Sequence, residues 1–162
     1  PMRLFLPIAF AMLTLAGAAC SQATPAPAAA VATLAKHPIS GLDVVPLTVS
    51  QNGKSHAFRV EVARTFEQQQ KGLMFRTAMG PDEGMLFPSD TAEPRSFWMK
   101  NTVIPLDIVF IGPDHLISNI AANAVPYSEA PIPSEGPAIA VLELNGGRAA
   151  QLGIRPGARV SW

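Results

Sequence analysis

Three polar residues interrupt the otherwise apolar stretch Ser96–Ile111, and they are the first candidates for chemistry: Lys100, Asn101 and Asp107. A buried polar group without a partner costs about 1–3 kcal/mol, so each must join a structural network or line a binding site. The four residues after Asp107 are all apolar. A carboxylate in such a run has a raised pKa if it is unpaired and stays ionised beside a cation. The pattern favours a structural role for Asp107, in a turn or an ion pair, over a role in binding.

Trp98 and Arg76 extend the set of candidate ligand-binding residues. The Trp98 ring offers a flat apolar surface, and an aromatic ring beside Asp, Asn and Arg is typical of a sugar site. Its structural alternative is a place in the core, with Asn101 as a turn residue. Arg76 could hold a carboxylate or phosphate through two parallel hydrogen bonds. In the structural alternative, the Arg76 guanidinium forms a bidentate ion pair with the carboxylate of Asp107 or Glu143.

Glu143 completes the set, because it interrupts an apolar strand near the end of the chain. By alternation it points opposite to its neighbours, toward solvent or toward the same site. The leading hypothesis is a non-enzymatic module that binds a small polar ligand such as a sugar or glycan. We expect no cofactor, no metal and no catalytic residue under this hypothesis.

Two other functions stay open. A hydrolase could use Asp107 and Glu143 as the paired carboxylates that glycosidases hold at a fixed separation. A copper-handling accessory protein could use Trp98 and methionine thioethers, which are soft Cu(I) ligands. Methionine is also a common core residue, and the four methionines in question form no dense cluster. They are Met74, Met79, Met85 and Met99.

Composition excludes several classes of protein. The chain has 162 residues, about one domain, and its 12 Lys and Arg residues equal its 12 Asp and Glu residues in number. Without a basic field to hold a phosphate backbone, nucleic acid is not an expected partner. A single Cys excludes an internal disulfide framework and a multi-Cys metal site.

The first 20 residues have the layout of an export signal. Arg3 gives a basic start, and an apolar run of about 16 residues follows, shorter than the roughly 20 that a spanning helix needs. Cys20 comes directly after small residues, which predicts a bacterial lipoprotein acylated at this Cys. The protein is then expected in the periplasm or cell envelope, anchored to a membrane. Ordinary cleavage near Ala19 or Ala23 is the alternative.

The residues that must position the site follow a tether. Residues 21–41 are rich in Ala and Pro and predict a flexible linker, so the single globular domain is expected over 42–162. Residues 56–63 alternate strictly, with Glu61 facing solvent, as in a half-buried strand. The capping box Thr65–Gln68 then starts a helix that is expected to run to about Phe75.

The remaining strands are short and closely spaced. Their spacing is too short for parallel crossovers, so the pattern predicts a mostly antiparallel sheet. The expected fold is α+β with β dominant: a curled sheet or barrel of seven or eight strands, with one main helix after the second strand. The predicted strands are 46–50, 56–63, 85–87, 95–99, 106–111, 115–122, 138–144 and 159–162.

Five short motifs occur in a fixed order along the domain. They are Gly72–Arg76 (GLMFR), Gly84–Phe87 (GMLF), Phe97–Thr102 (FWMKNT), Pro105–Asp107 (PLD) and Leu142–Gly147 (LELNGG). With these motifs the chain resembles the family called domain of unknown function 192, over about residues 58–160. The resemblance implies a compact β-rich domain, often exported or lipid-anchored. It carries no established reaction, and so it assigns no catalytic residue.

Overall fold

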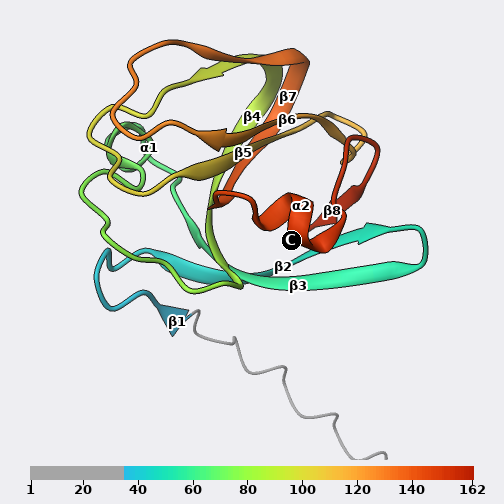
Figure 1. The fold of residues 1–162 in the computed structure, drawn as a ribbon, viewed down its shortest axis with the longest axis horizontal. Coiled ribbons are helices and arrows are strands. Elements are labelled where there is room, and N and C mark those ends of the chain that lie inside the picture. The colour runs from blue at the N-terminus through green and yellow to red at the C-terminus, as the bar shows by residue number, and fades with distance from the viewer. Residues whose placement is uncertain (1–34) are drawn as a thin grey trace, which may run out of the picture. The chain divides into compact units, whose positions relative to one another are not determined.

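The structure, a computed structural model, describes residues 35–162 of the chain. These residues form eight strands and two short helices, so the domain is mostly β (Figure 1). The strands are β1 (Ala35–Lys36), β2 (Asp43–Gln51), β3 (Lys54–Val62), β4 (Glu83–Phe97), β5 (Leu106–Ile111), β6 (Ile117–Ala124), β7 (Ile132–Asn145) and β8 (Arg159–Ser161). The helices are α1 (Phe66–Lys71) and α2 (Arg148–Leu152). None of the helices in this described part is long and apolar enough to cross a membrane.

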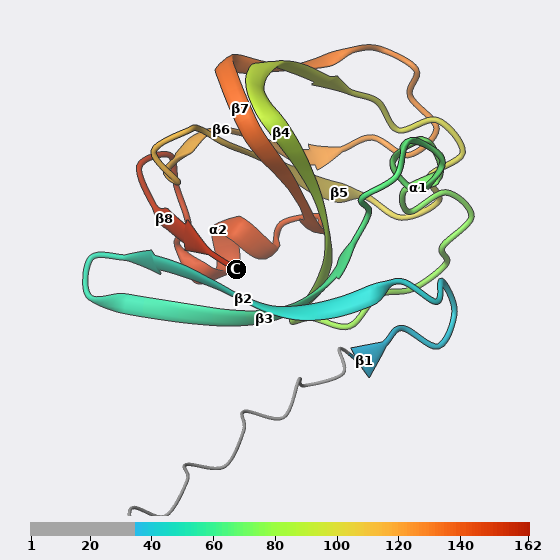
Figure 2. The same ribbon diagram turned by 180° about the vertical axis from the view of Figure 1, so that it is seen from behind.

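The strands form one mixed sheet in the order β1-β2-β3-β4-β7-β5-β6. All neighbours are antiparallel except β3 and β4, which run parallel. Figures 1 and 2 show the long strands β4 and β7 side by side across the sheet. The three-residue β8 pairs with β2, and one bridge joins Arg159 to Leu116 just before β6. These contacts leave the sheet open, so the barrel that the strand pattern allowed does not form.

Two predicted boundaries are wrong for the same reason. Strands 85–87 and 95–99 are parts of the single strand β4, and β7 begins at Ile132, six residues before the predicted strand 138–144. The pairing of β4 with β7 shifts register between Pro88 and Glu93 and again after Pro94. Proline cannot donate to a ladder, but it is tolerated where the ladder is irregular. The prolines therefore interrupt the register of the strand without ending it.

Helix α1 begins as predicted, with the Thr65 hydroxyl accepting from the Gln68 N–H and the Gln68 side chain accepting from the Thr65 N–H. It ends at Lys71, not at Phe75, because Gly72 adopts a positive φ of 47°. The expected position after the second strand is not confirmed, since the two-residue β1 makes β3 the third strand.

Two apolar clusters lie on opposite faces of the central strands. Leu142 and Leu144 of β7 belong to one cluster, beneath α2. Val141 belongs to the other, with Met85 and Ile108 from the neighbouring strands. Successive side chains of a strand point to opposite faces, so Glu143 shares the second face with Val141. This alternation puts one carboxyl into an apolar layer on the side of the sheet where α1 packs.

The described end of the predicted tether, residues 35–41, lies against the domain. β1 pairs with β2, and the His37 N–H donates to the Leu42 carbonyl. The Ser40 hydroxyl donates to the Glu61 carboxylate. The predicted signal, Cys20 and most of the tether lie outside the described residues.

Candidate functional site

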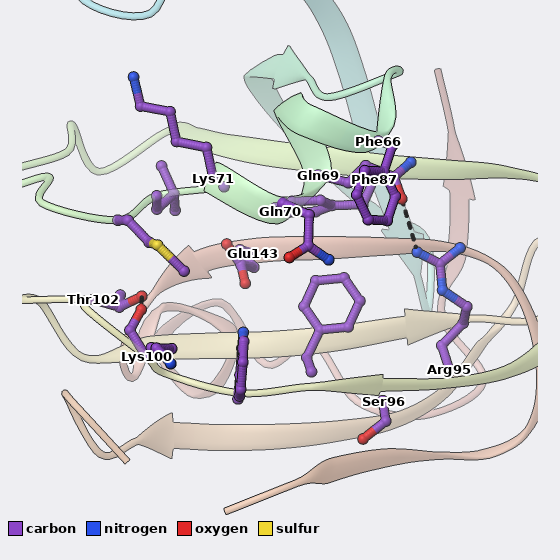
Figure 3. Close-up of a pocket in the computed structure, with 15 residues that line it drawn as sticks. Phe66, Gln69, Gln70, Lys71, Phe87, Arg95, Ser96, Lys100, Thr102 and Glu143 are labelled. Carbon is purple, nitrogen blue, oxygen red and sulfur yellow. Dashed lines mark hydrogen bonds between the residues drawn. The ribbon is translucent and has the colours of Figure 1, made fainter. Parts of the chain in front are cut away.

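A cleft lies between α1 and the outer half of β4 with the loop that follows it (Figure 3). We call it the α1 cleft, and its volume is about 180 Å³. Its floor and walls combine apolar rings, two glutamine amides, three cations and one carboxyl. The lining residues used below are Phe66, Gln69, Gln70, Lys71, Phe87, Arg95, Phe97, Trp98, Lys100, Thr102 and Glu143.

Two glycines of the sequence motifs set the shape of the α1 cleft. Gly72 ends α1 with a positive φ, and a Cβ there would lie 3.4 Å from the Phe87 ring. Gly84 on β4 leaves no room for any Cβ, which would lie 2.6 Å from the Glu143 carbonyl oxygen. Glycine lets backbones approach this closely. Helix α1 and strand β7, which carries Glu143, therefore both pack closely against β4.

Glu143 is the central polar group of the α1 cleft. It is 5% exposed, between Met85 of β4 and Ile108 of β5 in the sheet register. Within residues 35–162, no hydrogen bond or ion pair engages its carboxyl. Burial in this apolar layer disfavours the charged form and raises the pKa of Glu143 to about 8. At neutral pH the group is therefore a protonated acid that can donate a hydrogen bond.

Cations and aromatic rings surround this acid. Lys100 Nζ lies 5.0 Å from the centre of the Trp98 ring, which is 42% exposed. The Arg95 guanidinium lies 5.8 Å from the Phe97 ring and donates to the Gln69 side-chain oxygen at 3.3 Å, the dashed line in Figure 3. Such a mixture of exposed ring, amide and cation can bind a small molecule that has both apolar faces and polar edges.

The structure brings together three of the six residues predicted for the site. Trp98, Lys100 and Glu143 line the α1 cleft, whereas the other three candidates do not. The φ of Asn101 is 52°, and its carbonyl accepts from the Phe75 N–H, so it serves as a turn residue. Sequence patterns did not single out the contributions of α1 and Arg95, because a capping box predicts a helix but not the face it packs against.

Arg76 is part of a buried ion pair. Its guanidinium donates to both carboxylate oxygens of Glu61, at 2.9 and 3.0 Å. Neither Asp107 nor Glu143, the predicted alternatives, is its partner. Glu61 was predicted to face solvent, but it is 3% exposed, because residues 35–41 cover the outer face of β3 near His37. Arg76 therefore holds the start of the domain together and is not free to bind a ligand.

Replacing Arg76 with Met should lower the free energy of unfolding by about 3–5 kcal/mol, because it leaves the Glu61 carboxylate buried without its cation. Urea denaturation measures the loss. The exposed pair of Lys36 and Asp43 is the control, and Lys36→Met should cost less than about 1 kcal/mol. The double variant Glu61→Leu/Arg76→Met should be more stable than Arg76→Met alone. Equal losses for the buried and the exposed pair would contradict this account.

Asp107 is completely buried and engaged by the backbone. Its carboxylate accepts from the N–H groups of Asn123, Gly147 and Ala149 at 2.9, 2.8 and 2.8 Å. The last of these bonds caps α2, which has no side-chain cap of its own. Its structural role is thus a three-way connection between β5, the end of β6 and α2. The predicted ion pair is not what holds it.

The paired-carboxylate alternative does not fit this geometry. Asp107 is opposite Leu144 in the register of β5 with β7, and Ile108 is opposite Glu143. Paired residues share a face, so the two carboxyls point to opposite faces of the sheet. They cannot flank one bond of a substrate.

Of the four methionines in the copper alternative, Met74 lines the α1 cleft with Trp98. Met85 and Met99 are fully buried in the apolar cluster beside the α1 cleft, as core residues. Among residues 35–162, no group of three or more His, Cys, Asp or Glu side chains could hold a metal ion.

Comparisons with known proteins bear on the fold and the family. A protein of unknown function from Novosphingobium aromaticivorans DSM 12444 is 57% identical to the chain, with a TM-score of 0.78 over 82% of this chain and 94% of its own. A protein from Sinorhizobium meliloti 1021, described as a candidate transcription regulator, is 43% identical, with a TM-score of 0.72 over 74% of this chain and 94% of its own. No curated protein matches the chain.

The family model supplies the identification. The model of DUF192, described as uncharacterized ACR, matches residues 47–162. That range contains every element from β3 to β8 and the whole α1 cleft. The chain belongs to the DUF192 family.

Proposed function

We propose that the domain binds a small polar ligand, such as a sugar or glycan, in the α1 cleft. The observation that carries this proposal is the Glu143 carboxyl, which is buried, faces the cleft and has no partner within the described residues. Its oxygens are open to the cleft, so a ligand that enters can make the hydrogen bond that no protein group makes. Trp98 and Lys100 at the mouth would hold the ligand's ring and its polar edge.

The size of the α1 cleft supports a ligand of one ring. Its volume of about 180 Å³ is below the roughly 300–1,000 Å³ of sites for drug-sized molecules. A shallower apolar groove continues outward past Phe66, Met74 and Trp98. A longer glycan could extend along this groove from a first ring in the cleft.

The place of action is also a proposal. The basic, apolar and small segments of residues 1–20 support export, and Cys20 supports retention at a membrane through acylation. The domain would then meet its ligand in the cell envelope, joined to the membrane through the residues before β1.

Trp98→Ala should weaken the binding of a monosaccharide at least tenfold, about 1.4 kcal/mol, because an exposed ring is the main apolar contact of such a site. Isothermal titration with a panel of monosaccharides measures the affinity. The matched control is Trp162→Ala, since Trp162 is 43% exposed and packs at a tilt against the His115 ring, outside the α1 cleft. Equal effects of the two variants, or no binding of any sugar by the wild type, would overturn the proposal.

A further inference from the structure

We infer that the ligand of the α1 cleft is an acidic sugar, a monosaccharide unit that carries a carboxylate. This inference rests on the proposed function and names the chemical class of its ligand. It starts from the charges of the lining residues. Lys71 of α1, Arg95 of β4 and Lys100 of the following loop all line the cleft, and Glu143 is the only acidic lining residue within the described part of the chain.

The three cations are available to an anion. No carboxylate among residues 35–162 lies within 4.0 Å of the Lys71 or Arg95 side-chain nitrogens. Arg95 also lines a second groove with Asp90 and Glu93, but it makes no ion pair with either. The Lys100 Nζ lies 3.8 Å from a carboxylate oxygen of Glu129, and the two side chains are 40% and 62% exposed. An exposed pair at this distance is weak, so a ligand carboxylate can compete with Glu129 for Lys100.

Glu143 favours a carboxylate over a neutral hydroxyl. The lining of the α1 cleft presents Lys71, Arg95 and Lys100 to it and, among the described residues, no second acid. The acids Glu93 of β4 and Glu129 of the loop before β7 are exposed outside this lining. Burial keeps Glu143 protonated at neutral pH. A carboxylic acid that donates to a carboxylate makes a short, charge-assisted hydrogen bond, about twice as strong as a neutral one. The group that would repel an anion if it were ionised therefore becomes a donor to it.

The rest of the α1 cleft suits the sugar ring more than a bare anion. Gln70 supplies an amide, Thr102 supplies a hydroxyl, and Trp98 supplies an apolar face. A pyranose ring has hydroxyl edges and C–H faces that match these groups. A small anion such as acetate would use the cations and Glu143 alone.

The test is isothermal titration of the full-length protein with galacturonate, galactose and acetate at pH 7. We expect galacturonate to bind at least tenfold more tightly than either of the other two. Lys100→Gln should lower the ratio of galacturonate to galactose affinity at least threefold. Lys54→Gln, an exposed change at the distant β2–β3 hairpin, should keep that ratio.

The pH dependence gives a second readout. Above pH 8 the galacturonate affinity should fall by roughly tenfold per pH unit, as Glu143 ionises and repels the ligand. In Glu143→Gln the affinity should not change with pH in this range. A flat profile in the wild type would overturn the role of Glu143.

The outcomes separate the two proposals. Equal affinity for galactose and galacturonate would overturn the acidic-sugar inference and leave the proposed function standing. Binding of acetate as tight as that of galacturonate would overturn the role of the sugar ring. Binding of no sugar, acidic or neutral, would overturn both proposals.

Discussion

Asp107→Asn is expected to lower the free energy of unfolding by about 3–5 kcal/mol. The carboxylate accepts three backbone N–H groups while completely buried. Hydrogen bonds to a charged group contribute roughly 1.5–3 kcal/mol each. The amide keeps one oxygen and places an NH₂ group against an N–H donor, so at least one bond becomes a clash between donors. Such a loss is a large part of the stability of a domain, which is usually about 5–15 kcal/mol.

Urea denaturation at pH 7 measures this loss, and Asp114→Asn is the matched control. Asp114 accepts one backbone N–H, from Leu116 at 3.0 Å, at an exposed turn, so its loss should stay below about 1.5 kcal/mol. Because Asp107 is on the opposite face of the sheet from Glu143, folded Asp107→Asn should keep the sugar affinity of the wild type. If Asp107→Asn lost little stability but bound sugar more weakly, Asp107 would belong to the binding site and its structural role would be contradicted.

Local patterns in the sequence predicted local structure well. The capping box of Thr65 and Gln68 is present, because it depends on residues within one turn of the chain. The predicted apolar strand around Glu143 is present within β7, and Glu143 does reach a cleft. In these cases the physical cause lies inside the segment that shows the pattern.

Partners from distant parts of the chain could not be predicted in this way. Alternation gave Glu61 the correct face of β3 but could not show that His37 and Ser40 cover that face. Asp107 was favoured as structural, but its donors come from residues 16 to 42 positions later in the chain. A single sequence contains the pattern of each strand, but it does not state which segments pack on it.

The wild-type domain should become less stable as the pH rises from about 4.5 to about 8, through Glu143. The folded pKa of about 8 is above the ordinary value of 4.5, so between these values the folded state binds more protons than the unfolded state. The stability contributed by the protonated acid is fully present below pH 4.5 and is lost as the pH rises through 8. A shift of this size corresponds to at most about 5 kcal/mol.

Glu143→Gln isolates this contribution, because the amide cannot ionise and other titrating groups act equally on both proteins. The stability of the wild type minus that of the variant should fall by several kcal/mol between pH 5 and pH 9, as measured by urea denaturation at each pH. Glu93→Gln is the control, since Glu93 is exposed on β4 and should leave the pH profile unchanged. Parallel profiles for wild type and Glu143→Gln would show that Glu143 is ionised at neutral pH. It would then repel a carboxylate ligand, so the same measurement also bears on the acidic sugar in the α1 cleft.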